Sequence, residues 1–162
     1  MTTSQKTVLV LLRLAMGGFF FYAGLSKILD PSWTAAGYLS SAKTLPDFYA
    51  WLSSGTLLPL INIVNEWGLL LLGVSLILGL MVRASSSLGM MLMFLYYLPV
   101  LDFPYVGHSF IIDEHIIYIL VLALFFVWNR KIWSMDRWIA REFFGAELPE
   151  TKKEVPKYRF KR

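Results

Sequence analysis

The chain has 162 residues, of which 57% are hydrophobic and only 16% are charged, and its formal net charge is +4. A soluble domain usually has about 25% charged residues, so this composition argues against an ordinary soluble protein. The apolar residues also come in long blocks, which indicates a membrane protein. Because the sequence has no cysteine, disulfides, cysteine-ligated iron–sulfur clusters and thiol catalysis within this chain are excluded.

Four apolar segments are long enough to cross a bilayer, for which a helix needs roughly 20 residues. They are residues 8–29, 57–80, 84–103 and 111–128. The first has no small-residue cleavage site, so we interpret it as a retained span and not as a cleaved signal peptide. The pattern predicts an all-α, integral membrane four-helix bundle, formed by residues 1–128. Residues 129–162 are predicted to be a basic tail with an amphipathic helix on the inner membrane surface.

The positions of Lys and Arg predict the orientation of the bundle. With the N-terminus in the cytoplasm, Lys6, Arg83 and the ten basic residues after Trp128 lie inside, and only Lys27 and Lys43 lie outside. We therefore expect a multi-pass protein of the cell membrane with both termini in the cytoplasm. The basic tail suits an anionic membrane surface. Nucleic acid is a poor interpretation, because such a tail is the usual consequence of topology.

The link between the first two spans, residues 30–56, is much longer than the other links. Loops of this length are uncommon in compact domains and are often functional. We expect short helices near residues 33–42 and 46–52, folded as a lid over the outer mouth of the bundle. An aromatic belt at the membrane interface is the alternative, and the two can coexist. The aromatic residues of this link are Trp33, Tyr38, Phe48, Tyr49 and Trp51.

The second span carries a polar stripe made of Asn62, Asn65 and Glu66. Ionisable residues inside spans are costly and are hypotheses about function by default. Glu66 lies roughly 13 Å from the outer edge at about 1.5 Å per residue. The stripe is interpreted as an interhelical hydrogen-bond clasp, as a substrate or quinone pocket, or as part of a proton path. Arg13 near the inner edge either snorkels to lipid headgroups or pairs inside the bundle.

Three ionisable residues, Asp113, Glu114 and His115, stand at the start of the fourth span. Consecutive residues on a helix point in different directions, so this cluster does not favour a metal site, and no metal is predicted. Asp113 suits the positive end of the helix dipole. Glu114 and His115 keep a functional interpretation, since one of them should turn toward Glu66 and Lys27.

Small residues of the first two spans are predicted to let the helices approach closely. They are Gly17, Gly18, Ala23, Gly24, Gly68 and Gly73. This is a packing role and not a chemical one.

Several stretches together resemble the DoxX/DoxD family of small four-span membrane proteins. The matching stretches are RLAMGGFFFYAGLSKILDPSW, then GYL, then NEWGLLLLGVSLILGLMVRASSSLGMMLM, and a polar start to the fourth span. The resemblance covers roughly residues 12–128. The charged positions within these motifs are Arg13, Lys27, Glu66 and Arg83.

The resemblance implies a four-helix membrane fold. It also implies an activity like that of thiosulfate:quinone oxidoreductase, in which DoxD is one of two subunits. We therefore expect a membrane subunit of a quinone-linked oxidoreductase. Quinone is the expected cofactor, although no motif in the chain encodes one. The alternative is a non-catalytic accessory subunit that packs against and stabilises a larger membrane complex. Besides the bilayer, the expected partners are another subunit or a second copy of the chain.

In the enzyme hypothesis Glu66, His115 and Glu114 are the catalytic candidates, the last two as proton relays to the outer side. The binding candidates for substrate or quinone are Lys27, Asn62, Asn65 and Arg13. Lys27 would attract an anionic substrate such as thiosulfate. A quinone needs an apolar slot with a few polar groups at its carbonyls.

Overall fold

The computed structural model describes residues 2–107, 109–127 and 142. The predicted amphipathic tail helix, and the predicted domain of residues 129–162 apart from Glu142, lie outside the described residues.

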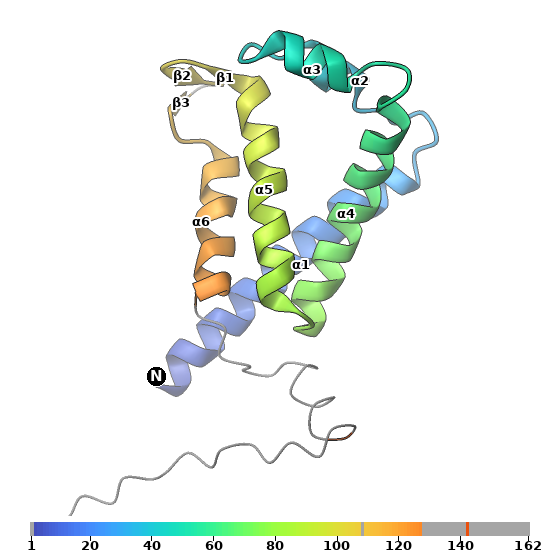
Figure 1. Ribbon diagram of the computed structural model, residues 1–162. Coiled ribbons are helices and arrows are strands. Elements are labelled where there is room, and N and C mark those ends of the chain that lie inside the picture. The colour runs from blue at the N-terminus through green and yellow to red at the C-terminus, as the bar shows by residue number, and fades with distance from the viewer. Residues whose placement is uncertain (1, 108, 128–141, 143–162) are drawn as a thin grey trace, which may run out of the picture.

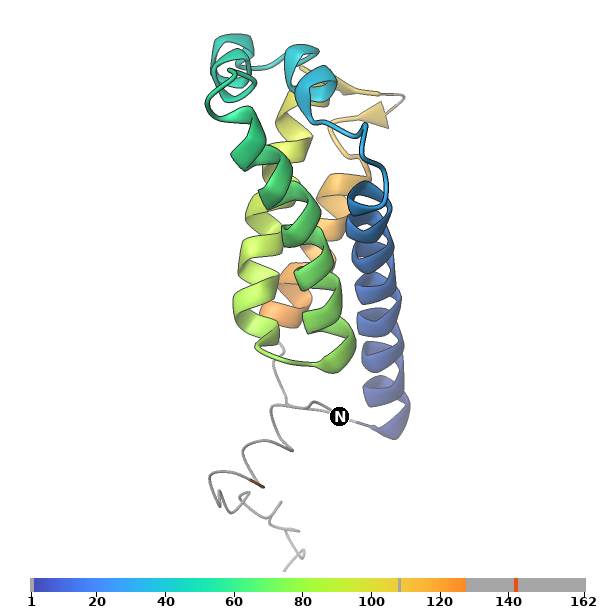
Figure 2. The same ribbon diagram turned by 90° about the vertical axis from the view of Figure 1, so that its right-hand side faces the viewer.

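Four long helices run lengthwise through the molecule (Figures 1 and 2). They are α1 (Thr3–Ile28), α4 (Leu58–Leu78), α5 (Val82–Val100) and α6 (Glu114–Val127). α1 crosses obliquely behind the others in Figure 1. α1 packs along α4 and α5 packs along α6, while α4 and α5 meet more loosely. The core between the four helices contains Phe20, Leu69, Leu76, Met93 and Leu122. The helical architecture agrees with the prediction.

The helix ends follow from local capping. α1 begins before the predicted residue 8 because Thr2 forms a capping box with Gln5, whose backbone N–H donates to the Thr2 hydroxyl. Gly79 ends α4 in the left-handed conformation, with φ of 70°, which glycine adopts without strain. α6 begins at Glu114 and not at 111, because the Asp113 carboxylate accepts the backbone N–H groups of His115 and Ile116, as an N-cap does.

The α1–α4 contact is a close backbone approach made by glycines. A Cβ at Gly73 would lie 2.3 Å from the Phe21 nitrogen, and one at Gly24 would lie 2.4 Å from the Leu70 nitrogen. The predicted packing role therefore holds for these two residues, and also for Gly17, where an added Cβ would lie 2.8 Å from Cγ1 of Ile77. It fails for Gly18 and Gly68, where an added Cβ would meet no described atom within 4 Å.

Both short helices predicted in the long link are present, as α2 (Ala36–Ser40) and α3 (Pro46–Leu52). They lie across one end of the bundle, which we call the linker end (Figure 1). Tyr49 is 1% exposed, and its hydroxyl donates to the Leu95 carbonyl at 2.9 Å. The Thr44 hydroxyl donates to the Leu101 carbonyl at 2.6 Å. The link is therefore a folded cover on the ends of α4 and α5.

The link between α5 and α6 is a small antiparallel sheet that the sequence analysis did not predict. Its strands are β1 (Leu101–Asp102), β2 (Tyr105–Val106) and β3 (Ser109–Phe110), in that order. The third predicted span, extended to residue 103, is therefore too long. α5 ends at Val100 because Leu101 takes an extended conformation and enters β1.

Two of the helices, α1 and α4, are each long and apolar enough to cross a membrane. α5 contains Arg83 and a run of three serines near its start, and α6 is described over 14 residues. All four helices expose large apolar side chains, such as Leu11, Leu71, Leu88 and Leu120, each at least 60% exposed. Large apolar side chains exposed on every long helix are typical of contact with lipid or protein. A span for each of α5 and α6 stays a prediction.

Candidate functional site

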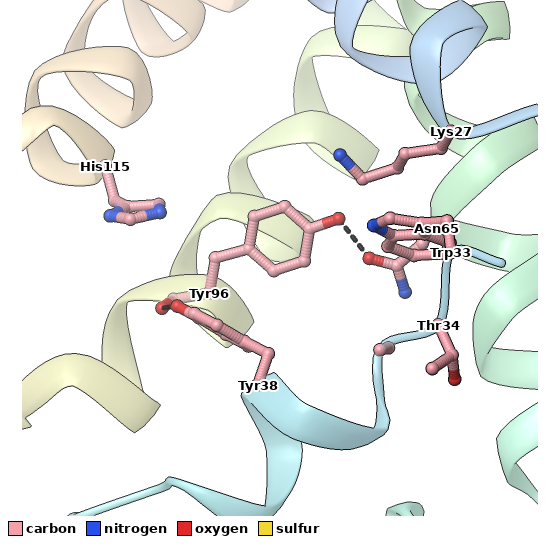
Figure 3. Close-up of a pocket in the computed structure, with 8 residues that line it drawn as sticks. Lys27, Trp33, Thr34, Tyr38, Asn65, Tyr96 and His115 are labelled. Atoms are coloured by element: carbon pink, nitrogen blue, oxygen red, sulfur yellow. Dashed lines mark hydrogen bonds between the residues drawn. The ribbon is translucent and has the colours of Figure 1, made fainter. Parts of the chain in front are cut away.

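A cavity of about 220 Å³ lies at the linker end, where all four long helices meet the link (Figure 3). We call it the polar cavity. Its walls come from α1, the link, α4, α5 and α6. The lining residues are Lys27, Trp33, Thr34, Ala35, Tyr38, Asn65, Tyr96 and His115.

A hydrogen bond between α4 and α5 stands at the centre of the polar cavity. The Tyr96 hydroxyl donates to Oδ1 of Asn65 (Figure 3). Nδ2 of Asn65 donates to the Ile61 carbonyl at 2.7 Å, and Asn65 is only 7% exposed. Both ends of the amide are therefore engaged, and its orientation is fixed.

Lys27 brings a positive charge to the cavity from the last turn of α1. Its Nζ lies 5.1 Å from the centre of the Trp33 ring, a cation–π geometry, and 3.4 Å from the Ala23 carbonyl. Among the described residues no carboxylate forms an ion pair with it. The ammonium group therefore keeps hydrogen-bonding capacity for an anion or a carbonyl oxygen.

His115 lies between the polar cavity and a second cavity. Its Nδ1 is 2.6 Å from Oδ2 of Asp113, and both side chains are less than one fifth exposed. Its ring stands edge-on to Tyr96, with centroids 6.1 Å apart. The second cavity, of about 490 Å³, is lined by Val106, Ser109, Asp113, Glu114 and His115 among others. Because a carboxylate orients the imidazole through one nitrogen, the other nitrogen is available for proton exchange.

The link residues that line the polar cavity, from Trp33 to Tyr38, form its roof and are held in place by hydrogen bonds. Oδ1 of Asn62 accepts the Ala35 backbone N–H at 3.0 Å, and its Nδ2 donates to the Thr34 hydroxyl at 3.2 Å. The Tyr38 hydroxyl donates to the Tyr96 carbonyl. Burial, and then the nearby Tyr49, Asp113 and Glu114, raises the pKa of Tyr38 to about 12. Tyr38 is therefore a neutral donor at physiological pH.

The structure brings together three of the predicted site residues, Lys27, Asn65 and His115. Of the pair left open by the sequence, His115 faces the bundle interior, and Glu114 is exposed and lines the second cavity.

The other predicted residues lie elsewhere. Asn62 points to the link and clasps it. Glu66 is half-buried on α4 and does not line the polar cavity. Arg13 is 8% exposed, on the face of α1 that also carries Met16 and Phe20. That burial argues against the snorkelling interpretation of Arg13.

Sequence reasoning missed Tyr96 as a site residue and treated Trp33 and Tyr38 only as linker aromatics. Tyr96 had a usable signal, since a tyrosine inside an apolar helix needs a partner for its hydroxyl. The partner, Asn65, was already a candidate. Nothing in the sequence indicates that Asn65 and Tyr96, which lie on different helices, are in contact.

The cavity size limits what it can hold. Sites for drug-sized ligands have roughly 300–1,000 Å³, so about 220 Å³ suits one ring or one small anion. Aromatic walls with an ammonium, a phenol and an imidazole fit a flat ring that carries carbonyl oxygens. No group of three or more His, Cys, Asp or Glu that could hold a metal occurs among the residues the structure describes.

Comparison with known proteins gives one match. A family model described as DoxX matches residues 8–101, which cover most of α1, the link, α4 and α5. No curated protein matches the chain. No solved structure matches it either.

Proposed function

The chain belongs to the DoxX family, and from this premise we propose that this membrane protein is a subunit of a quinone-linked oxidoreductase, of the thiosulfate:quinone type. In this proposal α1, α4, α5 and α6 all cross the cell membrane. The linker end is then outside and both termini are cytoplasmic, as the Lys and Arg distribution predicts.

The proposal rests on one observation: Lys27, the Tyr96–Asn65 pair and His115 converge on one small cavity under the folded link. The Lys27 ammonium supplies donors for a carbonyl oxygen, and the Tyr96–Asn65 pair, in which the phenol already donates to the amide, fixes the polar wall beside it. The Trp33 and Tyr38 rings supply flat apolar walls. An apolar site with few, well-placed polar groups is what a quinone ring requires. When bound, the quinone accepts electrons and protons.

Protons reach this cavity through His115 in the proposed mechanism. Its Nδ1 is held by Asp113 at 2.6 Å, so the opposite ring nitrogen exchanges a proton with the ligand oxygen. A positioned imidazole is the commonest general acid or base. Asp113 and Glu114 line the second cavity together with His115. They connect the imidazole with the aqueous side, which keeps Glu114 in the proposal as a relay.

The electron donor comes from outside this cavity. The chain has no cysteine, and the polar cavity holds one small ligand, not two. Electrons therefore arrive from a partner subunit or from thiosulfate that meets the quinone at the cavity mouth, where Lys27 attracts the anion. Arg13 lies several helical turns before Lys27 on α1, too far along the helix to reach this cavity, and Glu66, although next to Asn65, does not line it, so neither is proposed as a ligand-binding residue.

Quinone binding by the purified protein in lipid nanodiscs tests this proposal. The variants are Lys27→Met and Tyr96→Phe, with Lys43→Met and Tyr105→Phe as matched controls. The control residues are an exposed lysine and an exposed tyrosine at the same end of the molecule. Removing the Lys27 donor should weaken quinone binding roughly tenfold, as expected for one lost hydrogen bond of about 1.4 kcal/mol. Tyr96→Phe should weaken it less, because it only releases the Asn65 amide that the phenol holds. The controls should bind like the wild type.

The accessory subunit is the second candidate, and the lack of cysteine in the sequence favours it. Its distinguishing result is wild-type protein that binds no quinone but co-purifies with a larger membrane enzyme. Equal quinone binding by the Tyr96→Phe and Tyr105→Phe variants would also contradict the proposed site.

A further inference from the structure

An apolar cavity of about 420 Å³ opens between α4 and α5 on the outside of the bundle, and we call it the groove. The only hydroxyls among its lining side chains are those of Ser75 and Ser85, which are hydrogen-bonded to each other at 2.7 Å. The other lining residues have no polar side chain. The full lining is Val64, Gly68, Leu71, Leu72, Ser75, Met81, Ala84, Ser85, Leu88, Gly89, Met91, Leu92 and Leu95.

The groove lies between two ties that hold α4 to α5, which otherwise pack loosely. Near the linker end the Tyr96 hydroxyl donates to Asn65. At the opposite end, which we call the turn end, residues 79–81 join the two helices. Between these ties no described atom lies within 4 Å of a Cβ built at Gly68, and Leu71 and Leu88 are each at least 60% exposed. The groove is therefore a slot that opens sideways to the surroundings of the bundle.

Neither water nor empty space suits this groove. A water molecule needs polar partners, and the lining side chains offer only two serine hydroxyls, both toward the turn end. An empty space of this size forfeits dispersion contacts along its walls. In a bilayer, hydrocarbon from outside the chain therefore fills the groove.

The groove has the length of one leaflet of a bilayer. Arg83, an exposed cation in the first turn of α5, lies at the headgroup level, because a charge at the bilayer centre is costly. Leu95, the groove residue farthest along α5, is about 18 Å from Arg83 along the helix. On α4 the groove runs from Ser75 to Val64, about 17 Å. Half of the hydrocarbon thickness of a bilayer is about 15 Å, which is the depth that one acyl chain spans.

We propose that the groove binds one acyl chain of a phospholipid from the leaflet at the turn end of the bundle. The chain enters at Met81 and Ala84, beside the headgroup level, and its methyl end reaches the region of Leu95. A spanning helix of a second copy would run through both leaflets, so a groove as long as one leaflet does not fit it. The inference requires that α4 and α5 cross the membrane, as proposed above, but it does not require the quinone.

A photoreactive phospholipid tests the inference. The probe is phosphatidylethanolamine with a diazirine near the end of one acyl chain, incorporated into nanodiscs that hold the protein, and labelled residues are mapped by mass spectrometry. The variant is Gly68→Leu, which places a side chain in the groove where an added Cβ meets no described atom. The matched control is Gly18→Leu, a glycine with equally open space on α1. Stability and oligomeric state are measured for all three proteins, and quinone binding is measured separately.

The wild type and Gly18→Leu should be labelled most strongly around Val64, Leu92 and Leu95, at the closed end of the groove. Gly68→Leu should lose roughly tenfold of that labelling at unchanged stability, because methylene groups of the chain lose their place in the groove. Groove labelling in a protein that binds no quinone would contradict the proposed function and support this inference alone.

Three results would overturn the lipid site. Equal labelling of the groove and of the exposed faces of α1 and α6 would show bulk lipid only. A dimer that Gly68→Leu dissociates would show that a second copy, and not a lipid, covers the groove. Labelling of α1 and α4 with none on α5 would contradict both the site and the proposed span of α5.

Discussion

Two contacts of the same helix, α4, differ sharply. Against α1, the backbones of Gly24 and Gly73 come so close to the opposite helix that an added Cβ would collide with backbone atoms. Against α5, the two helices leave a groove of about 420 Å³, and Gly68 faces open space. Glycine therefore serves a tight contact in one place and a loose one in the other.

The two contacts of α4 therefore differ in role: the contact with α1 holds two helices together, and the contact with α5 borders the candidate site. The α1–α4 pair packs closely because small residues allow the two backbones to approach each other. The α4–α5 contact borders the polar cavity at the linker end and, along the two helices, the groove of about 420 Å³. Few direct contacts cross between α4 and α5, and Tyr96–Asn65 is one of them. The candidate site thus borders a contact that is packed less closely than that between α1 and α4.

The largest loss of stability at the α1–α4 contact is expected for Gly73→Ala. A Cβ at this position lies 2.3 Å from the Phe21 nitrogen, so α1 and α4 must move apart. Overpacking of this kind costs roughly 1–3 kcal/mol or more. Unfolding in mild detergent, followed by circular dichroism, should show the loss. The control Gly68→Ala should be neutral or slightly stabilising, because alanine favours helix by about 1 kcal/mol over glycine. Equal stability of the two variants would contradict the comparison.

The next effect concerns the roof, which Asn62 ties to α4. In Asn62→Ala the Ala35 N–H, in a residue that is 6% exposed, loses its acceptor. A buried unsatisfied donor costs roughly 1–3 kcal/mol. Hydrogen exchange and limited proteolysis of residues 30–56 should both increase. Asn62→Asp keeps the acceptor and should change the link much less. Similar proteolysis of both variants would show that the clasp does not hold the roof.

A smaller effect is expected at the loose contact. Tyr96→Phe removes the hydrogen bond to Asn65, and interhelical hydrogen bonds in membranes average about 0.6 kcal/mol. A double-mutant cycle with Asn65→Leu isolates the pair. The coupling energy should be favourable and well below the cost of Gly73→Ala. A coupling energy of zero would mean that the pair does not join α4 to α5.

The smallest effect is predicted for Lys43→Ala. Lys43 and Asp102 form an ion pair at 3.1 Å, but their side chains are 58% and 67% exposed. Exposed pairs contribute about 0–1 kcal/mol and are screened by salt. The backbone bond from the Lys43 N–H to the Pro99 carbonyl remains in the variant. A small stability loss that disappears in high salt would come from the ion pair with Asp102, whereas a large loss that persists in high salt would contradict this prediction, because a screened ion pair cannot cause it.

Much of the fold was predictable from local patterns. The long apolar segments, the two short helices of the link and the N-cap at Asp113 all follow from residues that are neighbours in the chain. The sheet between α5 and α6 was not predicted, because two-residue strands leave no alternation to detect.

The candidate site was predictable only in part. Lys27, Asn65 and His115 stand out because ionisable and amide groups in apolar segments are costly. Depth along the bundle placed Glu66 near them, but depth does not give the rotation of a helix about its own axis. That rotation turns Asn65 to the polar cavity and leaves Glu66, the next residue, outside its lining.

The sequence by itself determined that the chain is helical, apolar and of the DoxX type, because periodicity, composition and motifs are local properties. Only the tertiary structure decided which glycines touch a neighbouring helix, that His115 and not Glu114 faces inward, and that Tyr96 completes the site. The physical reason is that these facts depend on how four helices are rotated and spaced against one another. Packing between distant segments sets that arrangement, and no stretch of sequence carries it alone.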